Sequence, residues 1–196
     1  DIYEKITYEN FSFSTIAEVV PELKSRVLTV NGVSKAYSMT GWRIGYAGGP
    51  ENLIKAMAKI QSQSTSNPTS ISQYAALEAL KSSNDFLNDN NSIFLRRRNL
   101  ILEKINHING LNCNTPSGAF YIFPSCKDLI GLKSSSNKKI NNSTDFCEYL
   151  LEESGVAVVP GIAFGMENFF RISYATSEKI LELAINRIAK ACSKLN

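Results

Sequence analysis

The sequence predicts an open, layered α/β fold in which short strands alternate with amphipathic helices. Three observations lead to this prediction. Short β-branched or aromatic runs recur between longer segments whose apolar residues follow the helical period. A length of 196 residues with 43% hydrophobic content is enough to bury a core. The 11 glycines and 6 prolines are too few for a collagen-like or linker composition, so we expect a folded chain.

The charge and the apolar pattern argue against several classes of protein. The 21 basic and 18 acidic side chains give a net charge of +3, and the scattered basic residues do not predict a nucleic-acid partner. No apolar run approaches the ~20 residues that a membrane-crossing helix needs. The chain starts at Asp1 without the leader of a secreted protein, as a piece from inside a longer polypeptide would. We expect a cytoplasmic protein with no membrane partner.

The cysteines and the single histidine do not predict a metal site. Cys113, Cys126, Cys147 and Cys192 show no C-x-x-C spacing, and His107 has no second histidine near it, so we expect no zinc. The spacing alone allows disulfides, but free buried thiols in a reducing cytosol are the better expectation. His107 falls near the end of a predicted helix, where it would interact with the helix dipole rather than act as a catalytic base.

Two strands and an exposed loop are predicted in the first fifty residues. The run at 26–30 is β-branched and stops at Asn31-Gly32, which predicts a strand followed by a turn. Residues 31–42 are rich in Ser, Thr, Gly and Lys, and this composition suits an exposed loop. Residues 43–49 predict a second strand that ends in a pair of glycines.

Three helices are predicted to follow. Pro50 suits the first turn of a helix, and apolar residues continue at helical spacing as far as Ile60. After a polar break, a second helix is expected at about 70–82. A long helix is expected from about 84 to 108, because its apolar residues fall on one face.

The second part of the chain again alternates strands and helices. A composition break near 83–85 predicts a boundary between a domain at 1–84 and another at 85–196. The Ser, Asn and Lys-rich stretch 130–143 is interpreted as a surface insertion. Five further elements are expected, namely strands at 118–124, 156–159 and 169–174, a helix at 144–153 that Thr144 could cap, and a helix at 177–194.

The main candidates for catalytic and binding residues lie between the first two predicted strands. Lys35 is the only lysine in that loop, and Arg43 follows eight residues later. A lysine that is partly removed from water becomes an amine nucleophile, and an aldehyde is its natural partner. Arg43 offers a planar, two-pronged donor that suits a phosphate. A plainer interpretation stays open, because a lysine in a polar loop is commonly just solvated.

Position by position, this cluster resembles the pyridoxal-phosphate attachment signature of the class I aminotransferases, over fourteen positions. The resemblance implies that Lys35 is the catalytic residue and holds pyridoxal 5'-phosphate as a Schiff base. It also implies that Arg43 anchors the phosphate and that Ser34 binds the cofactor. The residues that agree with the signature are Gly32, Ser34, Lys35, Ser38, Met39, Gly41, Arg43, Ile44 and Gly45.

Further segments resemble the same family in the same order along the chain. Residues 160–165 and 170–175 resemble its C-terminal block, in which Arg171 would clamp the α-carboxylate of an amino acid. Tyr3 resembles the tyrosine whose hydroxyl reaches the phenolic oxygen of the cofactor. The family pattern there is Asp-x-x-Tyr, and Asp1 lies only two residues before Tyr3, so Asp1 is not the aspartate that pairs with the pyridine nitrogen.

The resemblance covers essentially all 196 residues, but only the C-terminal half of a typical family member. It implies an α/β protein of fold-type I, the pyridoxal-phosphate-dependent transferases. In that fold, 1–84 would be the C-terminal part of the large domain and 85–196 the small α+β domain. The sequence around Lys35 and the stretch 62–69 are most similar to the corresponding segments of bacterial aspartate aminotransferases. This similarity implies transfer of an amino group from L-aspartate to 2-oxoglutarate, and a homodimer at full length, with the chain alone inactive.

Two alternatives to this function stay open. The chain could be a non-catalytic fragment that folds or dimerises without turnover, or another pyridoxal-phosphate enzyme of the same fold, such as an aromatic or prephenate aminotransferase. The sequence does not fix which amino acid is preferred. The run 96–98 (Arg-Arg-Arg) is predicted to be a solvated helix face, and Phe120 and Tyr121 are predicted to be core residues.

Overall fold

The computed structural model describes residues 1–83 and 85–196 and shows two compact units. The first unit spans Asp1–Asn91 and the second spans Ser92–Asn196, so the boundary falls inside the helix α4 (Asp85–Asn106). Within the described ranges, none of the helices has both the length and the apolar character needed to cross a membrane.

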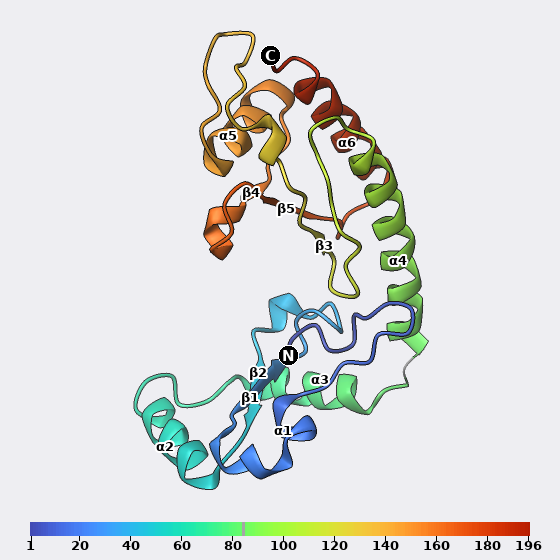
Figure 1. Ribbon diagram of the computed structural model, residues 1–196. Coiled ribbons are helices and arrows are strands. Elements are labelled where there is room, and N and C mark those ends of the chain that lie inside the picture. The colour runs from blue at the N-terminus through green and yellow to red at the C-terminus, as the bar shows by residue number, and fades with distance from the viewer. Residues whose placement is uncertain (84) are drawn as a thin grey trace. The chain divides into compact units, whose positions relative to one another are not determined.

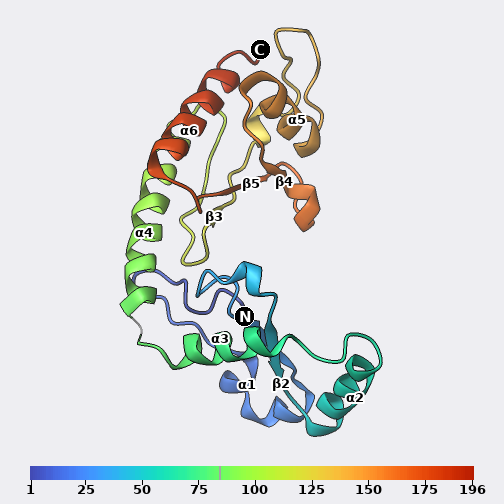
Figure 2. The same ribbon diagram turned by 180° about the vertical axis from the view of Figure 1, so that it is seen from behind.

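The first unit combines a two-stranded antiparallel sheet with short helices. Its elements before α4 are α1 (Ile16–Val19), a 3₁₀ turn (Pro21–Arg26), β1 (Thr29–Gly32), a 3₁₀ turn (Thr40–Trp42), β2 (Gly45–Gly48), α2 (Glu51–Ser62) and α3 (Ser70–Lys81). The strands β1 and β2 form a hairpin, and α3 lies beside it in both views (Figures 1 and 2). The buried hydroxyl of Ser72 on α3 donates to the carbonyl oxygen of Trp42 at 2.7 Å, which ties α3 to the connection between the strands.

The hairpin differs from the sequence prediction at Asn31-Gly32. These two residues continue β1 and pair with β2 instead of forming a turn. The strand predicted at 26–30 begins only at Thr29, because the preceding 3₁₀ turn extends to Arg26. Pairing with β2 therefore outweighs the local turn preference of Asn-Gly, and the chain reverses in the connection 33–44.

The helices of the first unit agree with the prediction where the apolar period is long. α2 and α3 confirm the two expected helices, and Pro50 directly precedes α2. The short helix α1 was not predicted, although its capping box is visible in the sequence as Thr-x-x-Glu. The hydroxyl of Thr15 accepts from the backbone N–H of Glu18 at 3.2 Å, and the Glu18 carboxylate accepts from the Thr15 N–H at 3.4 Å.

The second unit is a three-stranded antiparallel sheet with helices packed on it. Its elements after α4 are β3 (Tyr121–Ile122), a 3₁₀ turn (Lys127–Leu129), α5 (Ser143–Ser154), β4 (Val159–Pro160), a 3₁₀ turn (Gly161–Phe164), β5 (Phe170–Ser173) and α6 (Glu178–Cys192). The strand order is β3-β5-β4, so β5 is central. α4 and α6 run side by side, joined by the ion pair of Lys104 with Glu182 at 3.7 Å (Figure 1).

The core of the second unit lies between β5 and the helices. Phe170 and Ile172 of β5 are buried, and the ring of Phe170 meets that of Phe146 on α5 edge to face, with centroids 5.2 Å apart. Tyr149 on α5 is also buried, and its hydroxyl donates to the carbonyl oxygen of Ala191 on α6 at 2.8 Å. Burial of each large apolar side chain contributes about 1.5–3 kcal/mol, so this core stabilises the unit from within.

The arginine run 96–98 is not the solvated face that the sequence predicted. Arg96 is exposed and pairs with Glu178 of α6 at 2.5 Å. Arg98 is only 2% exposed, and its Nη1 donates to the carbonyl oxygen of Pro116 at 3.0 Å. Arginine tolerates such burial because its stem is apolar and its fixed donors reach backbone carbonyls. The prediction is wrong for Arg98.

Polar side chains lie at the start of α5 and at the end of α4. Asn142, rather than Thr144, caps α5, because its Oδ1 accepts from the N–H of Asp145 at 2.9 Å. His107 follows α4, and its Nδ1 lies 2.5 Å from the carbonyl oxygen of Glu103. The histidine therefore meets the carbonyl end of the helix, as expected from its position.

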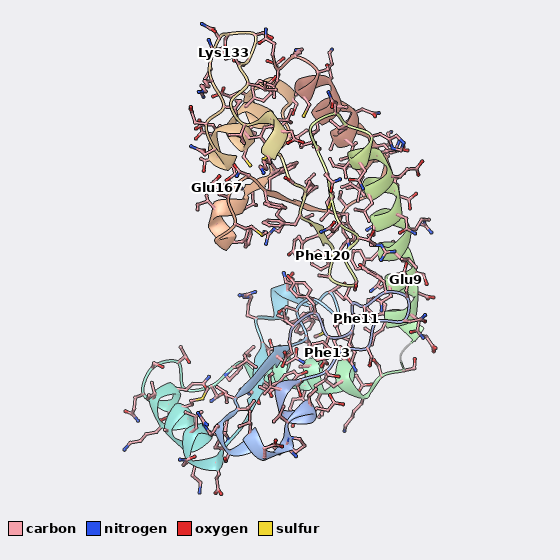
Figure 3. The ribbon with its side chains drawn as sticks, viewed as in Figure 1. Glu9, Phe11, Phe13, Phe120, Lys133 and Glu167 are labelled. Atoms are coloured by element: carbon pink, nitrogen blue, oxygen red, sulfur yellow. The ribbon has the colours of Figure 1, made fainter. Side chains whose placement is uncertain are left out.

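The stretch 130–143 runs as a long loop before α5, and it is tied to the C-terminus. The backbone N–H of Lys133 donates to the carbonyl oxygen of Asn196 at 2.7 Å, and the Asn196 N–H donates back at 3.1 Å. Lys133 and the loop that carries it are visible in Figure 3. The predicted surface insertion is thus a loop with a fixed base.

All four cysteines lie in the second unit and are buried as free thiols. This confirms the expectation of free buried thiols over disulfides. Burial raises the pKa of the thiols of Cys126, Cys147 and Cys192 to about 12 each. A thiol is a nucleophile only as its thiolate, so these groups are chemically quiet at neutral pH.

Candidate active site

Lys35 lies in a turn that begins directly after β1. Val33 and Ala36 on either side of it are buried, and they anchor the turn in the first unit. The backbone N–H of Tyr37 donates to the carbonyl oxygen of Val33 at 3.2 Å, and that of Ser38 donates to the Lys35 carbonyl oxygen at 3.3 Å. Alternation of buried and half-buried positions leaves the side chains of Ser34 and Lys35 partly accessible.

Arg43 lies two residues before β2, at the same end of the hairpin as Lys35. Because Gly32 at the end of β1 pairs with Gly45 at the start of β2, the segments that carry Lys35 and Arg43 leave the sheet together. The guanidinium of Arg43 is exposed, and its Nη1 donates to the carbonyl oxygen of Thr40 at 2.8 Å. This contact occupies one edge of the guanidinium and leaves its other donors toward solvent or an anion.

The backbone at Arg43 is strained. Its φ is 52°, in the left-handed region, and Ser38 in the same connection has a φ of 55°. Such a conformation costs about 1–2 kcal/mol for a residue with a Cβ. Strain of this kind gathers at functional sites, where the surrounding structure over-determines it, so it supports a role for this connection.

The N-terminal segment lies against the same hairpin. The amino group of Asp1 donates to the carbonyl oxygen of Val30 at 2.9 Å. The side chain of Ile2 packs near Gly32, with its Cδ1 3.8 Å from the place where a Cβ would stand on that glycine. Tyr3 is half-buried in this segment. The structure therefore brings Tyr3, Lys35 and Arg43 to one hairpin of the first unit.

Two further tyrosines belong to this neighbourhood, and the sequence reasoning missed them. Burial raises the pKa of Tyr37 and of Tyr46, and the nearby carboxylate of Glu4 raises both further. Both phenols therefore stay protonated at neutral pH and can donate a hydrogen bond. Their signal in the sequence is only a pair of aromatic residues that flank Lys35 and Arg43 in the hairpin.

Arg171 belongs to the second unit, on β5 opposite Val159 of β4. Its guanidinium carbon lies 4.4 Å from the ring centroid of Tyr121 and 4.6 Å from that of Phe164. Within the described residues, no acidic side chain forms an ion pair with it. Phe164 is a site residue that the sequence reasoning did not single out. Tyr121, predicted to be core, is half-buried beside Arg171, whereas Phe120 is buried as expected.

Comparison with known proteins identifies the family. The sequence model for class I and II aminotransferases matches residues 1–188, almost the whole chain. The chain belongs to this family. Members of the family use pyridoxal phosphate, and the predicted α/β fold of the pyridoxal-phosphate-dependent transferases is confirmed by the match.

Individual aminotransferases are similar over the full chain. The aspartate aminotransferase of Rhizobium meliloti strain 1021 is 58% identical over all 196 residues, which cover 48% of that protein. A probable aspartate/prephenate aminotransferase of Rickettsia bellii is 57% identical over 195 residues and 49% of its length. The crystal structure of the Rhizobium meliloti aspartate aminotransferase superimposes with a TM-score of 0.97 over 100% of this chain and 49% of that one. The chain thus spans about half the length of the relatives it matches.

The side chains of the first unit fit the cofactor of the aminotransferases in kind. An aldehyde needs an amine, and Lys35 offers one from a turn fixed by buried neighbours. A phosphate needs planar cationic donors. The guanidinium of Arg43 has N–H donors besides the one that contacts the Thr40 carbonyl oxygen. A phenolic ring oxygen needs a hydroxyl donor, and Tyr3 brings one to the same hairpin.

Proposed function

We propose that this chain forms the C-terminal half of an aspartate aminotransferase that moves an amino group from L-aspartate to 2-oxoglutarate. One observation carries the proposal. The fourteen-position attachment signature occupies one end of the β1–β2 hairpin, with Lys35 and Arg43 leaving the sheet together. The identity of 58% to the Rhizobium meliloti aspartate aminotransferase supports the choice of substrates.

Lys35 is the catalytic residue of this proposal. Pyridoxal phosphate, when bound, supplies the electron sink for bond cleavage at the Cα atom of an amino acid. The Nζ atom of Lys35 holds the cofactor until the amino group of the substrate displaces it. The freed amine of Lys35 would then accept the proton from the substrate Cα and deliver it to the cofactor carbon, acting first as general base and then as general acid.

The remaining residues bind and orient. Arg43 holds the phosphate with paired N–H donors, and Ser34 adds a hydroxyl beside Lys35. The hydroxyl of Tyr3 donates to the phenolic oxygen of the cofactor and stabilises its negative charge. Arg171 binds the α-carboxylate of the substrate, for which a guanidinium with no acidic partner among the described residues is suited.

Membership in the family supports a proposal for the larger organisation. Residues 1–84 contribute the C-terminal part of the large domain, and residues 85–196 form the small domain. The full-length protein is a cytoplasmic homodimer that takes amino acids and 2-oxo acids as substrates. Sedimentation of a polypeptide of the relatives' full length tests the dimer directly, since a single species of monomer mass contradicts it.

Borohydride trapping with pyridoxal phosphate, followed by peptide mapping, tests the role of Lys35. The 196-residue chain and a polypeptide extended to the relatives' full length are treated in parallel. We expect the label on Lys35, its loss in Lys35→Ala, and no change in the control Lys59→Ala on the exposed end of α2. Label only in the extended form shows that the chain needs further protein, and Lys35 unlabelled in both refutes the proposal.

A second candidate is an aminotransferase that also accepts prephenate. The observation in its favour is the 57% identity to the Rickettsia bellii relative, a probable aspartate/prephenate aminotransferase. Assays of the extended polypeptide with L-aspartate as donor separate the two, one with 2-oxoglutarate and one with prephenate as acceptor. Turnover in the extended polypeptide but not in the 196-residue chain favours the non-catalytic alternative for the chain itself.

A further inference from the structure

The strand geometry of the second unit places Arg171 and Tyr121 on one face of the sheet. Side chains alternate along β5, and the buried Phe170 and Ile172 point to the other face, toward the core. Tyr121 of β3 pairs with Ser173, two residues after Arg171, so Tyr121 is the diagonal neighbour of Arg171. The tyrosine ring therefore covers one side of the guanidinium as a consequence of the strand register.

The guanidinium also contacts the ring of Phe164, which comes from outside the sheet, with its carbon 4.6 Å from the ring centroid. Phe164 ends the 3₁₀ turn between β4 and β5, and this turn is fixed by its first residue, Gly161. The N–H of Gly161 donates to the Phe169 carbonyl oxygen at 2.7 Å, and the Gly161 carbonyl oxygen accepts from Met166 at 3.0 Å. A Cβ on Gly161 would stand 2.5 Å from that Phe169 oxygen, so only glycine fits here.

The ring of Phe164 is 47% exposed, so burial in the core does not explain its position. It is nevertheless supported from behind. Phe123 meets it edge to face at 5.8 Å, and Phe123 in turn stacks on Phe169 with centroids 5.4 Å apart. A half-exposed phenylalanine with this support is held over Arg171 at 4.6 Å, where its face attracts the cation.

We propose that Phe164 is a positioning residue for Arg171, which it clamps against Tyr121 so that only the N–H edge of the guanidinium faces a substrate carboxylate. The inference rests on the proposed role of Arg171 in carboxylate binding. Aromatic rings against a guanidinium leave the N–H donors in its plane open, and this is the plane in which a carboxylate accepts two N–H bonds. Neither ring uses an N–H donor, so the clamp orients the cation without occupying its binding edge.

Nuclear magnetic resonance of the ¹⁵N-labelled 196-residue chain tests the clamp without any need for turnover. The probe is succinate, and the readout is the Nε–Hε signal of Arg171, assigned by its loss in Arg171→Lys. In the wild type we expect this signal to shift in a saturable way. In Phe164→Leu we expect the unliganded signal to move, because a ring current is lost, and the dissociation constant for succinate to rise about fivefold.

Two variants separate the clamp from a general effect on folding. Phe164→Tyr keeps a ring over Arg171 and should bind succinate within about twofold of the wild type. Leu183→Ala removes an exposed side chain of α6, outside this aromatic row, and should leave the affinity unchanged. Backbone amide spectra of all variants report whether the second unit stays folded.

Two results of the succinate titration would overturn the proposal. An equal affinity for succinate in Phe164→Leu and the wild type overturns the proposal, and so does a wild-type Arg171 signal that does not respond to succinate. Borohydride labelling of Lys35 is independent of both, so its failure refutes the aminotransferase function while the succinate titration still decides the clamp.

Discussion

The two units of the chain differ in how much of their apolar surface they bury themselves. In the second unit, β5 and its helices enclose large side chains such as Phe170, Phe146 and Ile188. In the first unit, Ile71 and Tyr74 on α3 are 71% and 74% exposed, and Ile60 on α2 is 72% exposed. Exposed apolar faces of this size are typical of surfaces that pack against further protein. We therefore expect the second unit to be ordered by this chain alone, and the first unit to need contact with further protein.

The largest effect on this difference between the units is expected from a cavity in the core of the second unit. Phe170→Ala removes a fully buried ring and should lower the free energy of unfolding by about 3–5 kcal/mol. Hydrogen exchange of the α5 and α6 amides measures the loss. The control Phe86→Ala removes a ring that is already half-exposed, and it should change the free energy by less than about 1 kcal/mol. Equal losses in the two variants would contradict a self-contained core.

A second prediction concerns the glycine that shapes the turn before β5. Gly161→Ala forces a Cβ against the Met166 and Phe169 carbonyls, so the turn must shift at a cost of about 1–3 kcal/mol. Thermal unfolding and succinate titration measure the change, and we expect both stability and affinity to fall. The control is Gly41→Ala in the first unit, where a Cβ meets nothing within 4 Å. If Gly161→Ala behaves like this control, the packing described for the turn is wrong.

A third prediction concerns pH and two carboxylates near the start of α5. Glu167 lies beside this helix (Figure 3), and hydrogen bonding by Ser143, whose N–H is 2.6 Å from its Oε1, lowers the pKa of that carboxyl. Backbone and side-chain hydrogen bonds from Asn141 likewise lower the pKa of Asp145. Groups with depressed pKa values stabilise the fold above their unfolded pKa of about 4 and lose this contribution as the pH falls further.

The measurement for these carboxylates is the unfolding midpoint of the second unit between about pH 6 and pH 3. Stability should fall toward pH 3 in the wild type, and Glu167→Gln should flatten part of that fall. The matched control is Glu152→Gln, an exposed carboxylate late in α5 that faces Lys138 at 3.8 Å. A pH profile in Glu167→Gln identical to that of the wild type would show that the contact with Ser143 contributes nothing.

The smallest expected effect lies on the exposed face of the first unit. Ile71→Glu and Tyr74→Glu each replace a side chain that is largely in solvent, so stability should change by no more than about 0.5 kcal/mol. The solubility of the 196-residue chain should rise, since an apolar patch is interrupted. A large loss of stability would mean that this face is packed within the chain after all.

The sequence predicted the long elements well because their apolar period is strong. The helices α2, α3, α4 and α6 appear where hydrophobic spacing placed them. Local signals failed where tertiary contacts compete with them. Asn31-Gly32 is a turn by preference, yet pairing with β2 makes it a strand, and Arg98 is buried because Pro116 offers a carbonyl.

The candidate site residues are open to sequence reasoning only in part, and their roles stay predictions. Lys35, Arg43 and Arg171 belong to motifs that are contiguous in sequence, so a pattern could find them. No sequence pattern distinguishes Phe164 from other aromatic residues that are half-exposed. Its position over Arg171 depends on the turn that Gly161 fixes and on the register of three strands.

The distribution of two residue types gives each unit its own spectroscopic or chemical reporter. All four cysteines are buried in the second unit, whereas the single tryptophan, Trp42, is 43% exposed in the first. Alkylation by a thiol reagent therefore proceeds only when the second unit opens, and indole fluorescence follows the connection next to Arg43. Melting of either half of the molecule can be watched in the unmodified chain, with no engineered label.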